Sequence, residues 1–453
     1  MRLFGTSGIR GVYPHDINHN FAYKLGLSFA TYFKSGCAVI GYDCRRSSQP
    51  LALSLVSGIL DGGFNVELSN LTSTPAFQCY IATNKDRYKF GTMVTASHNP
   101  PEYNGFKLYT GDGLEAYRDV EVEIEKVMER EGFKEVEIGY IGKLEYLGEK
   151  INDNYVDQLM QYIEEEDVRG KHIVVDLCGC SSVKTIPKFL KKVKLKYKLI
   201  NNQIDGLFKT RPAEPRPDNV IQLVKAVKAS NADFGVAFDG DGDRAIFVDE
   251  KGVSWWGDLT GILIGKYLVE TGQTKYVVTP ITSTAATEMV IEEVGGRVIR
   301  TKVGGKNIVK EMISVGSKWG FEENGGGIYA PHIYGRDGGI TLIMILKTMK
   351  YYGEPLSQLL EQLPMLYQVK DKVRVLDREK ANKVIEEIKE KYNRYKQDTT
   401  EGVKIFFKDY EWVLVRLSGT EPIIRIFAES NTRKRARELV DKFKVEVSKS
   451  ISS

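Results

Sequence analysis

Short apolar, β-branched runs alternate with helical segments through most of this chain. The strand-like runs include CAVIGYD, HIVVDLC, ADFGVAFD, KYVVTP and GRVIRT, and helical patterns such as FAYKLGLSFATYF and IQLVKAVKAS lie between them. Runs that are apolar on both faces are typical of strands buried between helices. The alternation therefore predicts an α/β fold with mostly parallel sheets.

The length of 453 residues exceeds what one hydrophobic core supports. Two similar segments, LTSTPAFQCYI and PITSTAATEMVI, each follow a strand-like run. They are either a chance match between two Ser/Thr helix caps or a trace of duplicated α/β domains. Beyond about residue 365, strands such as GVKIFFKD and EWVLVRLSG with two charged helices predict a smaller α+β domain. The expected domains are 1–147, 148–250, 251–364 and 365–453.

The charge balance and the apolar content argue against several classes of protein. The net charge is +4, the hydrophobic fraction is 42%, and Lys and Arg are mixed with Glu along the chain. This composition is typical of a globular protein, and the weak positive charge suits a small anionic substrate without indicating nucleic-acid binding. No run of about eighteen apolar residues indicates a membrane span, and the N-terminus lacks the apolar core of a signal peptide.

The five cysteines show neither a metal-binding spacing nor a CxxC pair, and only Cys178 and Cys180 lie close together. Disulfides are rare in cytosolic proteins. We therefore expect reduced thiols in a cytoplasmic protein.

An acidic loop follows one of the apolar strands. In ADFGVAFDGDGDRAIFVDE, the residues Asp239, Asp241 and Asp243 alternate with glycines. Three carboxylates so close together repel one another unless a cation lies among them, and the glycines let the backbone turn tightly enough for them to converge. An all-oxygen site favours Mg²⁺ or Ca²⁺. The adjacent Arg244 can pair with an anion that the metal also contacts.

Two alternatives to a catalytic metal site are an EF-hand and a plain polar hairpin turn. Glu250 falls at position twelve of an EF-hand loop, but Arg244 stands where position six requires glycine. The flanking segments DFGVAF and AIFVDE resemble strands, whereas an EF-hand has helices there. The sequence therefore favours a metal site that handles phosphate, and a polar turn stays open.

The segment TASHNPPEYNGFK at 95–107 displays Ser97 among small and turn-forming residues. Acyl transfer is disfavoured, because a serine triad needs a histidine base, and His98, as the next residue, is expected to point away. The chain has five histidines and no GxSxG motif. Metal-dependent phosphoryl transfer, in which a metal ion and cations stabilise the transferred group, is the better hypothesis.

Five motifs, in this order along the chain, resemble those of the α-D-phosphohexomutases. They are FGTSGIRG, TASHNPPEYNGFK, DGDGDR, FEENGGG and RLSGTEPIIRI, and together they span nearly the whole chain. The resemblance implies three related α/β domains with mixed sheets and a smaller α+β C-terminal domain around a central cleft. It also implies a cytoplasmic enzyme that interconverts hexose 1-phosphate and hexose 6-phosphate.

The resemblance further implies roles for residues in each motif. Ser97 would carry phosphate, and a hexose 1,6-bisphosphate would be both intermediate and activator. The implied Mg²⁺ ligands are Asp239, Asp241, Asp243 and an oxygen on Ser97. Either Lys107 or His98 is the implied acid/base, and Arg10 the electrostatic stabiliser. The implied substrate-binding residues are Arg244, Glu322, Asn324, Lys306, Arg416, Ser418, Gly419, Thr420 and Arg425.

Departures from the family pattern leave the sugar open. Phe321 and Asn324 replace a Gly and a Ser common in the phosphomannomutase/phosphoglucomutase branch, and EENGG is also similar to phosphoglucosamine mutases. The serine segment is closer to the mannose and glucose branch. Family members often have His at the position of Gly305, so Lys306, Lys302 or another group would take over its role. We expect a mannose and/or glucose phosphomutase, with glucosamine phosphate or several of these sugars as the alternative.

Two other classes of function compete with a mutase. A metal-dependent phosphatase needs more metal-binding histidines or a DxDx[TV] motif, and the chain is poor in histidine and lacks that motif. A sugar-phosphate-binding protein without activity would lack catalytic groups that are present here. The expected partner is a phosphosugar, with no nucleic acid and no membrane, and a homodimer stays open.

Overall fold

The computed structural model describes residues 3–134, 136–375, 377–408, 410–418 and 422–452. The chain forms two compact units. The first comprises Met1–Thr260 and Asn324–Leu359, and the second comprises Gly261–Glu323 and Leu360–Ser453. None of the described helices combines the length and the apolar character that crossing a bilayer requires.

The first sheet of the first unit has the strands β1 (Ile9–Val12), β2 (Cys37–Tyr42), β3 (Asn65–Leu71), β4 (Phe90–Val94), β5 (Tyr103–Thr110) and β6 (Leu144–Gly148). Their order is β1-β5-β4-β2-β3-β6. Strand β2 runs parallel to β3 and β4, and β5 runs antiparallel to β4 and β1. The accompanying helices are α1 (His19–Phe33), α2 (Ser48–Asp61), α3 (Thr74–Thr83) and α4 (Arg118–Arg130).

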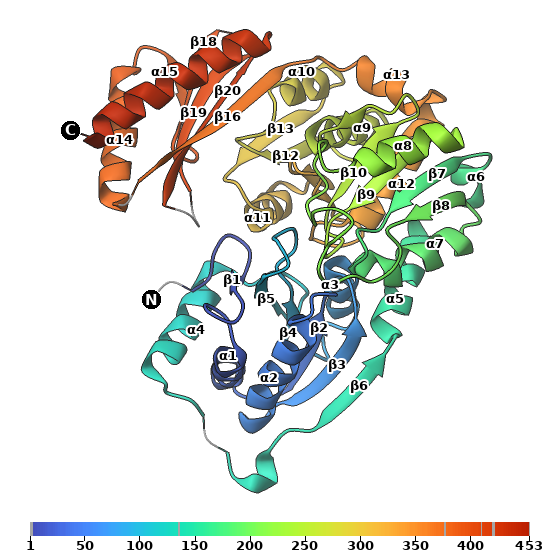
Figure 1. Cartoon of the computed structure of the whole chain (residues 1–453), viewed down its shortest axis with the longest axis vertical. Coiled ribbons are helices and arrows are strands. Elements are labelled where there is room, and N and C mark those ends of the chain that lie inside the picture. Colours follow the sequence, from blue (N-terminus) through green and yellow to red (C-terminus); the bar gives the residue numbers. More distant parts are fainter. Residues whose placement is uncertain (1–2, 135, 376, 409, 419–421, 453) are drawn as a thin grey trace. The chain divides into compact units, whose positions relative to one another are not determined.

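Helices α1 and α2 lie side by side (Figure 1), and two glycines allow their close approach. A Cβ atom on Gly58 would lie 2.0 Å from the carbonyl oxygen of Tyr23, and one on Gly26 would lie 2.3 Å from that of Leu55. Because real Cβ atoms do not come so close to backbone, the helix pair depends on glycine at both positions.

The second sheet of the first unit has the strands β7 (His172–Asp176), β8 (Lys196–Ile200), β9 (Phe234–Phe238), β10 (Ala245–Asp249) and β11 (Ser254–Trp255). Their order is β11-β10-β9-β7-β8, with β7 parallel to β8 and β9, and β10 antiparallel to β9 and β11. Helices of this part are α5 (Lys150–Leu159), α6 (Glu165–Val168), α7 (Ile186–Lys192) and α8 (Ile221–Ser230), with the short 3₁₀ helices η2 (Met160–Tyr162) and η3 (Ser181–Lys184). The 3₁₀ helix η1 (Ile138–Tyr140) lies between α4 and β6 of the first sheet. The later segment of the unit adds β15 (Gly327–Tyr329) and α12 (Gly338–Tyr352).

In the second unit, β12 (Tyr276–Pro280) runs parallel to both β13 (Arg297–Thr301) and β14 (Trp319–Phe321). Helices α10 (Ala286–Glu293) and α11 (Gly305–Val315) belong to this unit. The boundary between the two units falls within α9 (Gly257–Glu270) and within α13 (Leu356–Glu361).

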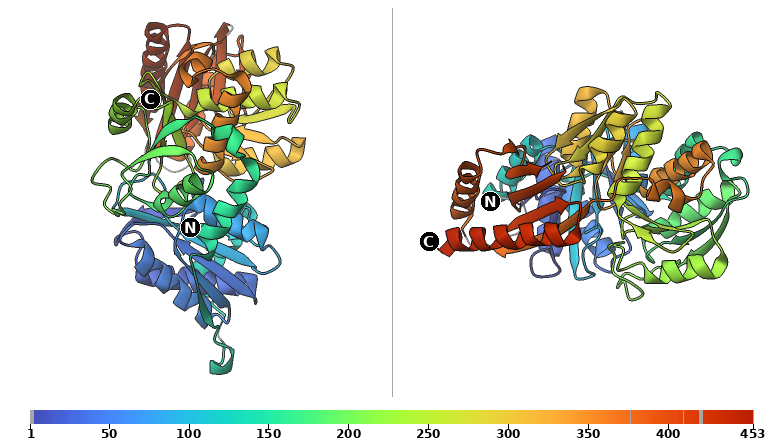
Figure 2. Two further views of the ribbon diagram at one scale, coloured as in Figure 1. Left: turned by 90° about the vertical axis from the view of Figure 1, so that its right-hand side faces the viewer. Right: turned by 90° about the horizontal axis from the view of Figure 1, so that it is seen from above.

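The C-terminal part of the second unit is an antiparallel sheet covered by two helices. Its strands are β16 (Tyr367–Arg374), β17 (Lys396–Asp398), β18 (Val403–Lys408), β19 (Glu411–Leu417) and β20 (Ile423–Ser430), in the order β16-β20-β19-β18-β17. Helices α14 (Arg378–Lys391) and α15 (Arg433–Ser452) pack apolar side chains such as Val384 and Phe443 onto one face. The long red C-terminal helix of Figure 2 is α15. This part is the predicted α+β domain.

The three α/β sheets share one plan. In each, three parallel strands have the first along the chain in the middle and the second and third on its two sides, as β4-β2-β3, β9-β7-β8 and β14-β12-β13. In the first sheet, β6 adds a fourth parallel strand beside β3. The fold is thus three related α/β domains with mixed sheets and a smaller α+β domain, as predicted. Most pairings in the first sheet are parallel, and antiparallel strands lie beside the parallel ones in the first and second sheets. The boundaries of these domains stay a prediction.

The two TST segments are not the trace of this repetition. The first of them leads from β3, the second strand of its sheet, into α3. The other leads from β12, the first strand of its sheet, into α10. Because the two segments occupy different places in the common plan, they are a chance match.

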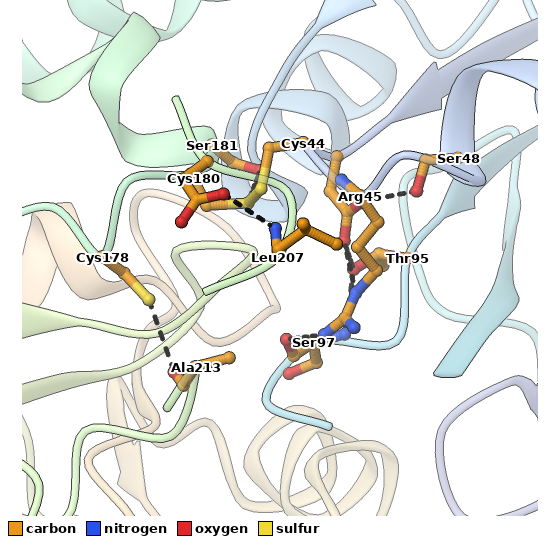
Figure 3. Close-up of a disulfide and its surroundings, with 12 residues drawn as sticks. Cys44, Arg45, Ser48, Thr95, Ser97, Cys178, Cys180, Ser181, Leu207 and Ala213 are labelled. Atoms are coloured by element: carbon orange, nitrogen blue, oxygen red, sulfur yellow. Dashed lines mark hydrogen bonds and ion pairs between the residues drawn. A yellow bond between two sulfur atoms is a disulfide. The ribbon is translucent and has the colours of Figure 1, made fainter. Parts of the chain in front are cut away.

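The expectation of reduced thiols is wrong for one pair. Cys44 and Cys180 form a disulfide (Figure 3). Cys37, Cys79 and Cys178 are free. The bonded cysteines are 136 residues apart and follow β2 and β7, which are the first strands along the chain of the parallel sets β4-β2-β3 and β9-β7-β8. The fold brings these strand ends together, which no sequence spacing could reveal.

Candidate active site

Three loops occupy equivalent places in the three α/β sheets, each directly after the third parallel strand. The serine loop, 95–102, lies between β4 and β5, and the metal loop, 239–244, lies between β9 and β10. The sugar loop, 322–326, follows β14 and precedes β15. The carboxyl ends of parallel strands, where strand order reverses, are the usual place for a site in such sheets.

Ser97 is fully buried, and its backbone has the left-handed φ of 53° that favours glycine. Its N–H donates to Thr95 Oγ1 (2.9 Å), and its Oγ donates to Asp239 Oδ2 (3.1 Å). The Nδ1 atom of His98 lies 3.4 Å from Ser97 Oγ. The expectation that His98 points away is therefore wrong, because the left-handed backbone turns both side chains toward one side. Such strain is characteristic of functional positions.

The three aspartates of the metal loop converge as predicted. Asp239, Asp241 and Asp243 are buried, and one carboxylate oxygen from each lies within 4.8 Å of the others. Lys107 of β5, which is 2% exposed, donates from Nζ to Asp241 Oδ2 (2.7 Å) and to Asp243 Oδ2 (3.1 Å). The sequence motif for the serine loop thus ends on a strand whose lysine reaches the metal loop.

Two further side chains bind the Oδ2 atoms of Asp241 and Asp243, which are called the outer oxygens below. Thr74 Oγ1 donates to Asp241 Oδ2 (2.5 Å), and Arg336 Nη2 donates to Asp243 Oδ2 (2.7 Å). The other oxygens, Oδ1 of Asp241 and of Asp243, are buried and have no hydrogen-bond partner among the described residues. Unpaired buried carboxylate oxygens are costly. Oxygen atoms held in this way fit a hard divalent cation such as Mg²⁺.

The charges of this cluster shift the pKa of each aspartate differently. Burial and the two neighbouring carboxylates raise the pKa of Asp239 well above its usual range. Burial acts in the same direction on Asp241 and Asp243, but nearby cations outweigh it there. Lys107 lowers the pKa of Asp241, and Arg336 with Lys107 holds the pKa of Asp243 far below its usual value.

Two arginines of the predicted site complete the cationic surroundings. Arg244 Nε lies 3.7 Å from Asp243 Oδ1 and 3.9 Å from Asp239 Oδ2. Arg10 lies on β1 opposite Gly105 of β5 and donates from Nη1 to Asn99 Oδ1 (2.8 Å). The N-terminal motif is therefore brought onto the serine loop by strand pairing.

The second half of the sugar loop packs on the strand that follows the metal loop. Gly325 has φ of 89°, and a Cβ atom there would lie 2.4 Å from the carbonyl oxygen of Ala245 on β10. Asn324 Oδ1 accepts from the N–H of Gly326 (3.2 Å). A Cβ atom on Gly326 would lie 2.6 Å from Arg336 Cδ, so this glycine lets the arginine pass over the loop toward Asp243.

The remaining predicted residues belong to the second unit. Glu322 is buried directly after β14, and Lys306 lies in the first turn of α11. Ser418 follows β19, and its N–H donates to the carbonyl oxygen of Ile423 (2.9 Å). The predicted Gly419 and Thr420 lie outside the described residues.

Arg416 and Arg425 form the core of a basic row in this unit. They lie directly opposite each other on β19 and β20, and Lys372 of β16 is opposite Arg425. Like charges in directly opposed positions are unfavourable, so a row of three cations on one sheet face fits an anionic ligand. Glu401 accepts hydrogen bonds from Arg416 and from the N–H of Val303 (2.7 Å), which ties the row to the loop before α11.

Models of four protein domains match the chain in order. Their descriptions are Phosphoglucomutase/phosphomannomutase alpha/beta/alpha domains I, II and III and C-terminal domain, matched by residues 1–135, 153–252, 256–367 and 369–444. A phosphoglucomutase/phosphomannomutase of Thermococcus kodakarensis is 37% identical over 448 residues, covering 97% of each chain. The chain belongs to the α-D-phosphohexomutase family. Members of this family are isomerases that move phosphate within a sugar phosphate.

Other relatives in the family carry different names. A phosphoglucosamine/phosphogalactosamine mutase of Sulfurisphaera tokodaii is 33% identical, with 98% of each chain covered. A phosphoglucosamine mutase of Methanocaldococcus jannaschii is 32% identical, with 97% of each chain covered. The names of the relatives therefore divide between the two branches that the sugar loop also left open.

Solved structures of the family share the fold. A phosphoglucomutase/phosphomannomutase family protein of Burkholderia thailandensis has a TM-score of 0.87 at 23% identity, covering 99% of this chain and 97% of that one. An N-acetylphosphoglucosamine mutase of Aspergillus fumigatus, solved with GlcNAc-6P and magnesium, has a TM-score of 0.64 at 16% identity, covering 99% and 96%.

Sequence reasoning missed several residues that the family motifs do not contain. Arg336 lies in GRDGG, and Thr74 stands at the start of α3. Lys372 completes the basic row from an exposed strand. The only available signal was for Thr74, which lies in the TST segment that was weighed as a helix cap. Arg336 and Lys372 carried no signal that separates them from surface residues.

Proposed function

We propose that this chain is a phosphohexomutase that interconverts the 1-phosphate and 6-phosphate of a hexose through a phosphorylated Ser97. The observation that carries the proposal is the buried Ser97 Oγ, 3.1 Å from Asp239, beside three converging aspartates and their cations. A serine held among acids in this way suits phosphoryl transfer better than acyl transfer. His98 contacts Ser97, but within the described part of the chain no carboxylate accepts a hydrogen bond from His98 to orient it as a triad base.

In the proposed reaction, phosphorus moves between two oxygens without net hydrolysis. The free hydroxyl of the bound sugar phosphate attacks the phosphoryl group on Ser97, and the bond from phosphorus to Ser97 Oγ breaks. The product of this half-reaction is a hexose 1,6-bisphosphate. The bisphosphate then reorients so that its other phosphoryl group faces Ser97. Ser97 Oγ attacks that phosphoryl group, the bond from phosphorus to the sugar oxygen breaks, and the isomeric monophosphate leaves.

The cations of the first unit have distinct tasks in this proposal. Arg10 and Arg244 would face the negative charge of the transferring group. The opposing carboxylates raise the pKa of Lys107 despite its burial, so Lys107 acts as an ammonium group that holds Asp241 and Asp243. His98 remains the candidate to accept or return the hydroxyl proton, since its Nδ1 is 3.4 Å from Ser97 Oγ. Burial and the nearby arginines lower the pKa of His98 well below its usual value.

The proposed ligands of Mg²⁺ are Asp239, Asp241 and Asp243. When bound, the ion would withdraw charge from the phosphoryl group during transfer. Lys107, Thr74 and Arg336 would keep the outer carboxylate oxygens in place, so that the unpaired inner oxygens face the ion.

The basic row of the second unit is proposed to bind the phosphate that does not transfer. Arg416, Arg425 and Lys372 offer adjacent donors on one sheet face. Ser418 and the adjacent Gly419 and Thr420 are proposed to join them. Glu322, Asn324 and Lys306 are proposed to bind sugar hydroxyls or phosphate oxygens.

The sugar is proposed to be mannose and/or glucose, with glucosamine as the alternative. The name of the Thermococcus relative supports the first, and those of the Sulfurisphaera and Methanocaldococcus relatives support the second. Hexose 1,6-bisphosphate is the proposed activator, because it would transfer a phosphoryl group to Ser97 whenever that residue is unphosphorylated. A cytoplasmic location and a homodimer remain proposals.

The test is a phosphorus NMR assay with Mg²⁺, a trace of glucose 1,6-bisphosphate and, separately, the 1-phosphates of glucose, mannose and glucosamine. We expect a growing 6-phosphate signal from the wild type and from a Ser57→Ala control on the exposed face of α2. We expect none from Ser97→Ala. Relative rates among the three sugars decide between the two branches.

Two results would contradict the proposal. Release of inorganic phosphate at the rate of substrate loss would indicate a phosphatase. Full mutase activity in Ser97→Ala would remove the phosphoserine from the reaction.

A further inference from the structure

The Cys44–Cys180 disulfide lies beside the serine loop (Figure 3). Cys44 is followed directly by Arg45 in the segment between β2 and α2, and Cys180 lies after β7. These segments come from the first and second sheets of the first unit. The proposed reaction uses neither of them.

Arg45 is 2% exposed, and its guanidinium group donates to four backbone carbonyls around Ser97. The acceptors are the carbonyl oxygens of Ser97 (2.8 Å), Asn99 (2.6 Å), Pro100 (2.5 Å) and Tyr103 (3.1 Å). One rigid side chain therefore fixes the whole serine loop, which suits the planar five-donor geometry of arginine and not that of lysine.

Arg45 is itself held on two sides. Its Nε donates to Asp43 Oδ2 (3.2 Å), and its guanidinium group lies 4.9 Å from the centroid of the Phe208 ring. The same Asp43 Oδ2 accepts from Thr95 Oγ1 (2.6 Å), which in turn accepts from the N–H of Ser97. Asp43 and Arg45 thus fix the serine loop through both a side chain and the backbone.

The other end of the disulfide supports the metal loop. The N–H of Ser181, next to Cys180, donates to the carbonyl oxygen of Gly240 (3.3 Å). A Cβ atom on Gly240 would lie 2.6 Å from the carbonyl oxygen of Ser97, which is one of the four that Arg45 binds. The two loops are therefore in backbone contact, and the disulfide joins the segments that support them.

We propose that Arg45 is a positioning residue for phosphoryl transfer at Ser97, and that the Cys44–Cys180 disulfide keeps this arginine in register with the metal loop. The inference rests on the proposed function, because it concerns the distance between Ser97 and the metal-binding carboxylates. Without Arg45, four carbonyls lose a charged donor. Displacement of the reacting oxygen by about 1 Å costs on the order of 100-fold in rate.

The disulfide makes this arrangement sensitive to reductants. A dithiol that reduces it breaks the bond between the two sulfur atoms and leaves a thiol on Cys44 and on Cys180. Two electrons and two protons pass to the protein, and the dithiol becomes a cyclic disulfide. Arg45 and Asp43 alone then restrain the segment, so the geometry loosens without being lost.

The first experiment compares Arg45→Gln with Arg46→Gln, a control at the exposed neighbouring position. We expect kcat of Arg45→Gln to fall about 100-fold, with KM changed less than about twofold because no substrate contact is lost. Amide hydrogen exchange of the serine loop should be faster in Arg45→Gln, with or without substrate. Wild-type kcat and wild-type exchange in Arg45→Gln would overturn the proposal.

The second experiment addresses the disulfide and does not depend on how Arg45→Gln folds. Thiol counting of the denatured wild type should give three reactive thiols before reduction and all five after it. Treatment with dithiothreitol, and the double variant Cys44→Ser/Cys180→Ser, should each lower kcat by about tenfold and speed exchange in the serine loop. Five thiols without reductant, or unchanged kcat and exchange, would overturn the role of the disulfide.

Failure of the proposed function would look different. A wild type that converts none of the three sugar phosphates would refute the mutase. Hydrogen exchange of the serine loop would still show whether Arg45 and the disulfide hold it.

Discussion

Three side chains of the first unit hold two carboxylates, those of Asp241 and Asp243, that would otherwise repel each other. Lys107, Thr74 and Arg336 bind Oδ2 of these aspartates, and the Oδ1 atoms, which have no hydrogen-bond partner among the described residues, are the proposed metal contacts. Second-sphere partners of this kind orient metal ligands, and their loss costs metal affinity even though they never contact the ion.

Arg336→Gln should therefore weaken metal binding by about 10- to 100-fold, because Asp243 loses the donor that fixes its outer oxygen. The measurement is a Mn²⁺ titration followed by electron paramagnetic resonance, which needs no catalysis. Arg216→Gln, at an exposed arginine of the same unit, is the control and should bind as the wild type does. Unchanged affinity in Arg336→Gln would show that Asp243 is oriented without it.

In the second unit, a buried lysine has a lowered pKa. Lys404 of β18 donates from Nζ to the carbonyl oxygen of Ile281 (2.9 Å) and lies 3.8 Å from the ring centroid of Trp412. Burial, with a contribution from Arg300, lowers the pKa of Lys404 to about 7. Below that pH, both the folded and the unfolded state carry the proton. Between this pKa and the ordinary value of 10.5, only the unfolded chain does.

The free energy of unfolding should consequently rise with pH above about 7, by at most about 1.4 kcal/mol per pH unit from this group. Lys404→Met should remove that part of the slope, whereas Lys408→Met, at the exposed end of the same strand, should keep it. Urea denaturation at several pH values, followed by tryptophan fluorescence, measures the difference. Equal slopes in both variants would contradict the lowered pKa.

The sequence predicted the acids and the serine of the site because closely spaced motif residues stay together when the chain folds. Asp239, Asp241 and Asp243 lie within one loop, and their mutual repulsion alone indicated a cation. Arg336 and Arg45 could not be found in that way. Their partners lie far along the chain, so only the paired strands and packed loops show what they contact.

At the scale of elements, the loop that follows the third parallel strand carries candidate site residues in all three α/β sheets. A loop after the third parallel strand carries the serine, the aspartates and the sugar-loop residues in turn. The strand patterns predicted this alternation well, because buried parallel strands are apolar on both faces. Of the antiparallel strands beside them, AIFVDE was predicted and is β10, but β1 and β5 were not. Strands such as β1 and β5 carry the polar residues Arg10 and Lys107, which interrupt the apolar pattern.

The close packing of α2 against α1 gives a prediction about stability. Gly58→Ala should lower the free energy of unfolding by about 1–3 kcal/mol, because its Cβ would be forced against the backbone of α1. Ser57→Ala, the exposed neighbour on α2, should change it by less than about 0.5 kcal/mol. Chemical denaturation of both variants provides the measurement. A Gly58→Ala protein as stable as Ser57→Ala would show that α1 and α2 separate easily.

At the scale of the whole molecule, the proposed metal ligands all belong to one of the two units. Binding to the folded state alone stabilises by about 2.7 kcal/mol when Mg²⁺ is at about 100 times its Kd. Mg²⁺ should therefore slow amide hydrogen exchange within Met1–Thr260 and Asn324–Leu359, and leave the basic row of the second unit unchanged. Asp243→Asn should abolish the effect. Equal slowing in both units would show that they unfold together.

The first unit is built from two stretches of chain with part of the second unit between them. During synthesis, Ser97 and the three aspartates leave the ribosomal exit tunnel first. Residues 261–323 of the second unit follow, and Arg336 emerges only after them. Domains generally fold as units during synthesis. The acidic loop therefore lacks its contact with Arg336 while residues 261–323 of the second unit emerge. A nascent chain that ends before residue 336 therefore lacks one of the cations that hold the acidic loop.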